Sequence, residues 1–338
     1  VPPLEPRDTG YRTGGVRASR TTQGEEGTVD RTLSLPHARR RLSRMRLQEY
    51  VWGYLLILPW LLGFFIWTAG PMLASIVISF LDWEIVTPPK WAGLANYTHL
   101  FHDDLFLTSL ANTAYYTFLG VPLHLAVALL AALLLTVPLR GINLLRTAFY
   151  LPAIVPSVAN TLLWVWILNP TFGLANAFLH RFGIPPLHWL DDPMLAKPTL
   201  ILMSLWTLGN VMVIFIAGLE GVPAALYEAA EIDGAGRLSR IRHVTLPMIS
   251  PVIFFNLIVS LIGSFQVFTV AYIATNGGPE NATLFYLLYL YRTGFEYFRM
   301  GYASALAWVL FLIIALFTVV QFRLSRRWVY YEIERRRP

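Results

Sequence analysis

The sequence predicts an all-α polytopic membrane protein with six transmembrane helices. Two features of the composition lead to this fold class: 56% of the 338 residues are hydrophobic and only 14% are charged. Soluble domains are nearer a quarter charged. A third observation is that the apolar residues gather in long segments separated by short polar gaps. Together they favour a chain that folds within a lipid bilayer.

Six segments are long and apolar enough to cross the membrane. A helix of about 20 apolar residues, rising 1.5 Å per residue, covers the roughly 30 Å hydrocarbon core. None of the segments contains Asp, Glu, Lys or Arg, and His124 is the one imidazole within them. We interpret His124 as a packing residue, with a proton relay as the alternative. The segments are residues 51–80, 110–136, 147–169, 199–219, 251–275 and 302–322.

Basic residues predict the orientation of the segments. With the N-terminus in the cytoplasm, the cytoplasmic flanks carry 16 basic residues and the external gaps carry five, as the positive-inside rule expects. The cytoplasmic ones are Arg39, Arg40, Arg41, Arg44, Arg46, Arg140, Arg146, Arg237, Arg240, Arg242, Arg323, Arg326, Arg327, Arg335, Arg336 and Arg337. The external ones are Lys90, Arg181, Lys197, Arg292 and Arg299. Both termini are therefore expected in the cytoplasm, on either side of a multi-pass domain in the cytoplasmic membrane.

The segments outside this domain are predicted to be tails. Residues 1–46 should form a disordered basic cytoplasmic tail, because most of them are polar, with many Gly, Thr, Arg and Glu residues. They lack the apolar core and cleavage site of a secretory signal. Residues 47–325 form the membrane domain. Residues 326–338 form a second basic cytoplasmic tail, for which binding to anionic lipid and ordinary solvation are the two readings.

The gap between the fourth and fifth segments contains the most informative stretch of the chain. It reads Glu-Ala-Ala-Glu-Ile-Asp-Gly-Ala over residues 228–235 and continues to Leu246-Pro247. Pro223 suits the first turn of a helix, the alanines favour helix, and Gly234 suits its C-terminal end. We predict a helix of about ten residues across the membrane end, and then a second helical stretch that leads into the fifth segment.

The residue types of this loop suit docking on another protein. Ala229 and Ala230 are small, so the helix can seat deeply in a cleft. Glu228 can accept charge-assisted hydrogen bonds from a partner. Asp233 can bond nearby backbone N–H groups and hold the turn. An ordinary polar loop that contains Glu-Ala-Ala by chance is the alternative interpretation.

The loop resembles the EAA loop of ABC-importer permeases, whose pattern is E-A-A-x-x-D-G-A, ten variable residues and then L-P. Other motifs resemble the same family in the same order along about residues 50–325, and they are similar to its carbohydrate branch, which includes maltose-type and glycerol-phosphate-type permeases. These motifs are Trp91-Ala92-Gly93-Leu94-Ala95-Asn96-Tyr97, Asn112-Thr113, Phe149-Tyr150-Leu151-Pro152, Trp164, Asn169-Pro170 with Gly173, and Asn276-Gly277-Gly278-Pro279 with Thr283.

The resemblance implies a permease subunit that imports a sugar or polyol by alternating access. The family's loop contacts a separate ATPase. That role carries over to Glu228, Ala229, Ala230, Asp233, Gly234, Ala235, Ile241, Leu246 and Pro247. The family often has Phe at the position of Ile241, so the apolar anchor is smaller here.

The resemblance also implies a set of partners. They are a second permease subunit, an ABC ATPase dimer that binds ATP and Mg²⁺, an extracytoplasmic solute-binding protein, the carbohydrate substrate and membrane lipid. The second permease is expected to be a different chain, with a homodimer as the alternative. Nucleic acid is not an expected partner.

The sequence contains no catalytic motif. It has no G-x-x-x-x-G-K-[ST] loop to hold ATP phosphates, no H-E-x-x-H and no cysteine. His99 and His102 have metal-like spacing but lack a convincing third ligand. We therefore expect no catalytic residue, no metal and no cofactor in this chain, and ATP hydrolysis by a partner.

Polar side chains within the spans are the candidates for the substrate path: Asn210, Asn256, Ser260, Ser264 and Gln266. Three of them recur every four residues and so share one face of the fifth helix. The alternative is that they hold helices together. Because no Arg or Lys lies within a span, a neutral solute is favoured over glycerol 3-phosphate or another charged one. An ion-coupled secondary transporter, the rival class, would need inverted repeats and intramembrane ionisable residues, and neither is apparent.

Overall fold

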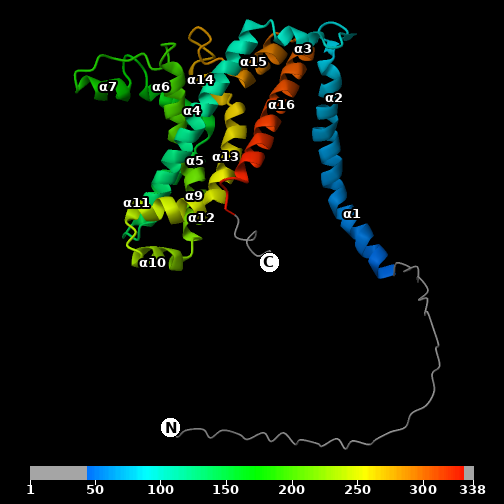
Figure 1. The fold of residues 1–338 in the computed structure, drawn as a ribbon. Coiled ribbons are helices and arrows are strands. Elements are labelled where there is room, and N and C mark those ends of the chain that lie inside the picture. The colour runs from blue at the N-terminus through cyan, green and yellow to red at the C-terminus, as the bar shows by residue number, and fades with distance from the viewer. Residues whose placement is uncertain (1–43, 331–338) are drawn as a thin grey trace, which may run out of the picture. The chain divides into compact units, whose positions relative to one another are not determined.

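The computed structural model describes residues 44–330, whose regular secondary structure is almost all helix (Figure 1). The chain divides after Leu61 into two compact units. Helix α1 spans Arg44–Phe64, so residues 44–46 of the predicted N-terminal tail begin a helix. The rest of that tail, residues 1–43, and residues 331–338 of the predicted C-terminal tail lie outside the described residues.

The second unit contains the remaining elements. Its first half consists of η1 (Phe65–Ala69), α2 (Gly70–Ser79), β1 (Leu81–Asp82), β2 (Lys90–Trp91), α3 (Ala95–Leu100), α4 (Asp104–Leu135), α5 (Ile142–Ile154), α6 (Ser157–Ile167) and α7 (Leu174–His180). Its second half consists of α8 (Ala196–Leu205), α9 (Gly209–Glu220), α10 (Ala224–Ile232), α11 (Arg237–Arg240), η2 (Ile241–Thr245), α12 (Leu246–Met248), α13 (Ser250–Phe265), α14 (Thr269–Ala274), α15 (Tyr286–Tyr291), η3 (Arg292–Glu296) and α16 (Met300–Ser325). The two short strands pair antiparallel, with Leu81 opposite Trp91. The predicted all-α class is therefore confirmed, with one small ribbon added.

The membrane-crossing segments fall into two kinds. Three helices are long and apolar enough to cross alone: Gln48–Ser79, Asp104–Leu135 and Met300–Ser325. Three helix pairs pass the same test together but are bent: α5 with α6 by 99°, α8 with α9 by 48°, and the α11–α12 segment with α13 by 67°. Residues 44–330 thus hold three spans, or up to six if each bent pair crosses as one.

The sharpest bend has a direct sequence cause. Val155 is extended, with φ −67° and ψ 131°, immediately before Pro156. A residue that precedes proline is pushed out of the helical region by the proline ring. Residues 147–169 therefore do not form one continuous helix. The fifth predicted segment is also interrupted, since α13 ends at Phe265 and α14 is a separate short helix that packs against α6.

Helix α4 organises the second unit, and it packs against α8, α9, α13 and α15. One apolar core surrounds its first half, with Phe106 and Tyr116 buried among residues of α8, α13, α15 and α16. A second core surrounds its second half, with Ala128 and Ala132 against α9. The small α10 lies at the end of the bundle opposite α3 and α15 (Figure 1). We call these the α10 end and the α3 end.

Candidate functional site

The loop that the sequence singled out contains helix α10. Pro223 is its N-cap residue rather than its first helical residue, with φ −58° and ψ 128°. Gly234 follows the last turn with φ +75°. The N–H of Gly234 donates to the carbonyl of Glu231 at 3.0 Å, and the N–H of Ala235 donates to that of Ala230 at 2.9 Å. This Schellman pattern is the helix stop that glycine favours, because positive φ is strained for other residues.

The outer surface of α10 is free of internal contacts. Glu228, Ala229 and Gly234 are exposed, as is Asp233. Within residues 44–330, the side chain of Glu228 makes no hydrogen bond and no ion pair. A carboxylate that the fold itself does not use is available to a partner protein.

The inner surface of the loop is braced by contacts between its own helices. The hydroxyls of Tyr227 and Thr245 lie 3.1 Å apart, which joins α10 to η2. Arg240 Nη1 lies 3.3 Å from Glu231 Oε2, which joins α11 to α10. The second helical stretch is also present. There Ile241 and Leu246 are half-buried and Pro247 is exposed, just before the 67° corner into α13. The loop is therefore a braced unit attached directly to α13.

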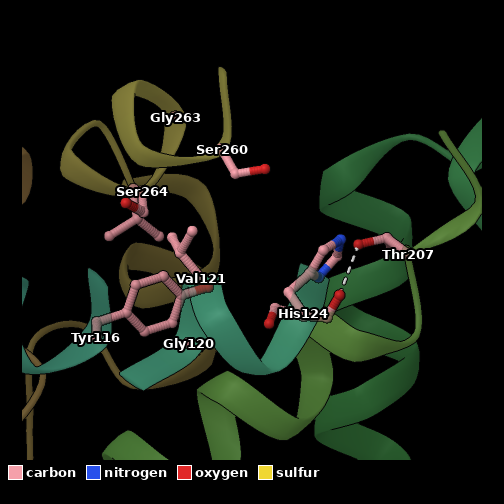
Figure 2. Close-up of a pocket in the computed structure, with 10 residues that line it drawn as sticks. Tyr116, Gly120, Val121, His124, Thr207, Ser260, Gly263 and Ser264 are labelled. Carbon is pink, nitrogen blue, oxygen red and sulfur yellow. Dashed lines mark hydrogen bonds between the residues drawn. The ribbon is translucent and has the colours of Figure 1, made fainter. Parts of the chain in front are cut away.

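A cavity of about 210 Å³ opens between α4, α8 and α13 (Figure 2). It lies along α4 where the two apolar cores meet. Its polar lining consists of hydroxyls and one imidazole. Gly120 and Gly263 also line it, and neither has a side chain that could occupy the cavity. The lining residues are Tyr116, Gly120, Val121, His124, Ser204, Thr207, Ser260, Gly263, Ser264 and Val267. None of these ten carries a carboxylate, an ammonium or a guanidinium group.

A second cavity of about 180 Å³ adjoins the first. The two share Tyr116, Ser204 and Thr207, and the second adds Asn160 and Thr161 of α6 to the lining. Polar groups from four helices thus line these two neighbouring cavities.

The predicted path residues divide between this region and other places. Ser260 and Ser264 line the first cavity. Asn256 is buried, and its Nδ2 donates to the carbonyl of Val252 at 3.1 Å, so its amide is occupied within its own helix. Asn210 and Gln266 are exposed. For these five, a role in the path stays a prediction.

Sequence reasoning missed several lining residues. Tyr116, Ser204 and Thr207 come from helices that only tertiary packing brings together, so no local pattern marks them. His124 was interpreted as a packing residue. In the structure His124 lines the cavity beside Thr207 (Figure 2), and its spacing of four residues from Gly120, which puts both on one face of α4, is the signal that could have found it.

The motifs at the α3 end act as structural anchors. Asn112 Nδ2 donates to the carbonyls of Asn281 and Leu284 at 2.8 and 3.1 Å. Thr113 Oγ1 accepts the N–H of Tyr286 at 2.8 Å. The two side chains therefore hold the loop that follows the Gly-Gly-Pro turn against α4. Similarly, Asn96 Nδ2 donates to the carbonyls of Ser79 and Leu81 at 2.9 and 2.8 Å, which ties α3 to the end of α2 and to β1.

Two arginines that the sequence places in an external gap make contacts within the α3 end. Arg292 Nη2 donates to both the carbonyl and the side-chain oxygen of Asn276 at 2.8 Å. The Arg299 guanidinium lies 5.1 Å from the ring centroid of Tyr302. Both groups stabilise the α3 end and add no free charge to the cavity.

Asp103 accepts four hydrogen bonds at the α3 end, and it was not among the residues that the sequence marked as functional. Its Oδ1 accepts the N–H groups of Leu105 and Phe106, so it caps α4. Its Oδ2 accepts the hydroxyls of Tyr289 and Tyr302, each at 2.5 Å. Burial raises the pKa of Asp103, but the four hydrogen bonds outweigh burial and hold the pKa below its ordinary value. Burial and the Asp103 carboxylate both raise the pKa of Tyr289.

Replacing Asp103 with alanine should lower the melting temperature of the detergent-purified protein by several degrees. A lost N-cap costs about 1 kcal/mol, and each lost hydrogen bond to a charged acceptor about 1.5–3 kcal/mol. Asp104→Ala is the matched control, because Asp104 is the exposed neighbour. Since the folded-state pKa of Asp103 is lowered, its contribution is present above the unfolded value of about 3.9 and is lost as pH falls through the folded pKa. The difference between the two variants should therefore shrink only below about pH 4. Equal melting temperatures at neutral pH would contradict the role of Asp103.

Comparisons with known proteins agree on one family. A family model described as the binding-protein-dependent transport system inner membrane component matches residues 105–330. YesP of Bacillus subtilis, a probable ABC transporter permease protein, is 43% identical over 295 residues, covering 86% of this chain and 95% of YesP. UgpA of Yersinia enterocolitica, an sn-glycerol-3-phosphate transport system permease protein, is 37% identical over 285 residues, covering 82% of this chain and 95% of UgpA.

MalF of Thermococcus litoralis, a trehalose/maltose transport system permease protein, is 31% identical over 289 residues, covering 84% of this chain and 97% of MalF. A bacterial alginate ABC transporter, solved in complex with an alginate pentasaccharide-bound periplasmic protein, contains a chain of the same fold. The TM-score is 0.75 at 24% identity, covering 84% of this chain and 96% of that one. The chain therefore belongs to the inner-membrane permease components of binding-protein-dependent ABC transport systems, in the branch whose members are sugar permeases.

Proposed function

We propose that this permease moves a neutral, hydroxyl-rich solute, a sugar or polyol, across the cytoplasmic membrane by alternating access, driven by a separate ATPase. The observation that carries the proposal is the hydroxyl-lined cavity between α4, α8 and α13. Side-chain hydroxyls both donate and accept hydrogen bonds, so they can replace the water around a sugar. The ring of Tyr116 offers an apolar face of the kind on which sugar rings stack.

The same cavity argues against a charged solute. A phosphate removed from water needs a cation or several strong donors, and the ten lining residues include no Lys or Arg. The printed names of three relatives, AraP, MalF and LacF, refer to arabinooligosaccharides, trehalose/maltose and lactose. These names support a carbohydrate. Glycerol 3-phosphate is the second candidate, because UgpA is named for it.

The loop around α10 is proposed to dock on the ATPase. The excess of arginine on its side of the predicted spans supports a cytoplasmic position for the α10 end and for both termini. Glu228, which is exposed and has no side-chain partner within residues 44–330, is the acceptor for the partner, and Gly234 sets the turn that follows α10. ATP and Mg²⁺ are expected on the ATPase, with no cofactor in this chain.

The geometry gives a direct route from the loop to the cavity. The braced loop continues through α12 into α13, and α13 carries Ser260, Gly263 and Ser264 on the cavity wall. We expect a rigid-body movement of the loop to be carried through α12 and α13 to the wall of the cavity. Alternating access of this kind is a two-state transition that ATP and solute bias.

The partner set is tested by purification of this chain from native membranes in several mild detergents, followed by mass spectrometry. We expect an ATPase, a second permease and a solute-binding protein. Recovery of ATPase and binding protein with no second permease would indicate a homodimer. Recovery of this chain alone in every detergent would contradict the proposed assembly and favour an ion-coupled transporter.

A further inference from the structure

The chain turns back on itself after the last long helix. Helix α16 ends at Ser325, and the carbonyl of this residue accepts the N–H groups of Trp328 and Val329 at 3.1 and 2.8 Å. Ser325 itself is buried. The turn directs residues 326–330 toward the α12–α13 corner. We call these five residues the C-terminal strap.

The strap is attached to the corner by a partly buried hydrogen bond. The N–H of Tyr330 donates to Ser250 Oγ at 2.9 Å, and Ser250 Oγ donates to the carbonyl of Pro247 at 2.7 Å. Ser250 is 3% exposed, so water does not compete well for these bonds. One hydroxyl thus links the strap, the end of the loop and the start of α13.

Aromatic packing supports the same attachment. The Trp328 ring meets the Phe254 ring of α13 edge-on, with centroids 6.0 Å apart and an interplanar angle of 82°. Phe254 in turn meets Phe322 of α16 at 5.2 Å. Edge-to-face pairs at these distances are favourable beyond the area that they bury.

The strap also faces the loop helix. A cavity of about 220 Å³ is lined by Tyr330 together with Leu226 of α10, His243 and Val244 of η2, and Pro247 and Met248 of α12. Tyr330, whose N–H donates to Ser250, therefore lies next to the loop that we propose to dock on the ATPase.

We propose that the C-terminal strap is a second mechanical link of the ATPase-coupling loop, and that Trp328, Tyr330 and Ser250 are positioning residues for coupling. The loop reaches α13 directly through the chain. Through the strap it also reaches α16, which packs against α2, α3 and α15 and so extends to the α3 end. Because the strap joins α13 and α16 to the loop, the two helices move together with it. This inference rests on the proposed function, because the coupling loop is part of that proposal.

Two truncations separate the strap from the residues that follow it. A chain ending at Tyr330 keeps the strap and removes only residues 331–338, whereas a chain ending at Ser325 removes the strap as well. We expect the Tyr330 truncation to take up solute like the full chain. The Ser325 truncation should lose about tenfold of the solute moved per ATP hydrolysed by the assembled transporter, within the usual range of coupling effects. Equal behaviour of the two truncations, whether both active or both inactive, would overturn the proposal.

A cysteine pair tests the link without removing residues. The chain has no cysteine, so Ser250→Cys combined with Tyr330→Cys offers one possible disulfide within the chain, and non-reducing gel electrophoresis distinguishes it from a disulfide between chains. Ser250→Cys alone should reduce the uptake per ATP, because the thiol is a weak donor and acceptor. Oxidation of the double variant should restore the uptake per ATP to that of the full chain, and reduction of the disulfide should lower it again. Membrane level and co-purified ATPase should not change in any of these variants.

Failure of the strap and failure of the proposed function give different results. If the full chain shows no ATP-driven uptake in the same assay, the proposed function is wrong. If the full chain transports normally and the oxidised double variant is inactive, the link is not a rigid one and the strap proposal is overturned.

Discussion

Replacing Glu228 with lysine should remove most ATP-driven uptake while leaving the protein in the membrane at its normal level. Glu228 is exposed on α10 and has no internal partner within residues 44–330, so the fold does not depend on it. The loss of a charged partner at an interface typically costs 2–5 kcal/mol, which corresponds to about 30-fold or more. The measurement is uptake of labelled solute, paired with the ATPase activity of the purified complex.

The control is the same charge change at an exposed site away from the loop. Asp191 is exposed in the segment between α7 and α8, and Asp191→Lys should transport normally. Gly234→Pro should resemble Glu228→Lys, because proline cannot adopt the φ of +75° and lacks the N–H that bonds Glu231. Wild-type uptake by Glu228→Lys would sink the coupling role of the loop.

Replacing Gly263 with leucine should block solute uptake without destabilising the protein. Gly263 lines the 210 Å³ cavity, and a Cβ at this position would meet nothing within 4 Å. A leucine side chain therefore enters open space rather than a packed core. Glycine within a helix also costs about 0.8–1 kcal/mol relative to a good helix former, so the exchange favours the helix. We expect uptake to fall at least about tenfold, as differences of a few methylene groups do in binding pockets.

Gly263→Ala is the matched control for the leucine variant. A methyl group occupies little of the cavity and also favours the helix, so uptake should stay close to that of the natural protein. The two variants should have equal melting temperatures and equal membrane levels. Normal KM and maximal rate in Gly263→Leu would mean that the solute passes elsewhere, and would return Ser260 and Ser264 to a packing role.

The helices could be predicted from the sequence because bilayer-length apolar segments are a local signal. The bends could be predicted only in part. The break at Val155-Pro156 could be predicted, since proline constrains the residue before it, whereas α13 ends at Phe265 with Gln266, not glycine, as its C-cap, and the sequence predicts that this segment continues to residue 275. Asp103 could also be recognised from the sequence as a helix N-cap, but its two tyrosine partners lie more than 180 residues away along the chain. Contacts at that separation come from tertiary packing.

The cavity shows the same division between local and long-range signals. Four-residue spacing correctly grouped Ser260 and Ser264 on one face of α13. It grouped Asn256 with them, yet that side chain bonds the carbonyl four residues earlier, as short polar side chains in helices can do. Ser204 and Thr207 join them only because α8 packs against α4. The helix of the loop and its end at Gly234, by contrast, could be predicted because alanine and glycine act locally, although Pro223 is the N-cap and not the first helical residue.

ATP-driven accumulation of solute in proteoliposomes tests the central claim most directly. The complex purified with this chain would be reconstituted with its solute-binding protein, and labelled sugar uptake would be measured with ATP or a non-hydrolysable analogue on the α10 side. We predict accumulation only with ATP and binding protein together, no accumulation with an ion gradient alone, and loss of accumulation in Glu228→Lys. Accumulation driven by an ion gradient without ATP would contradict the account.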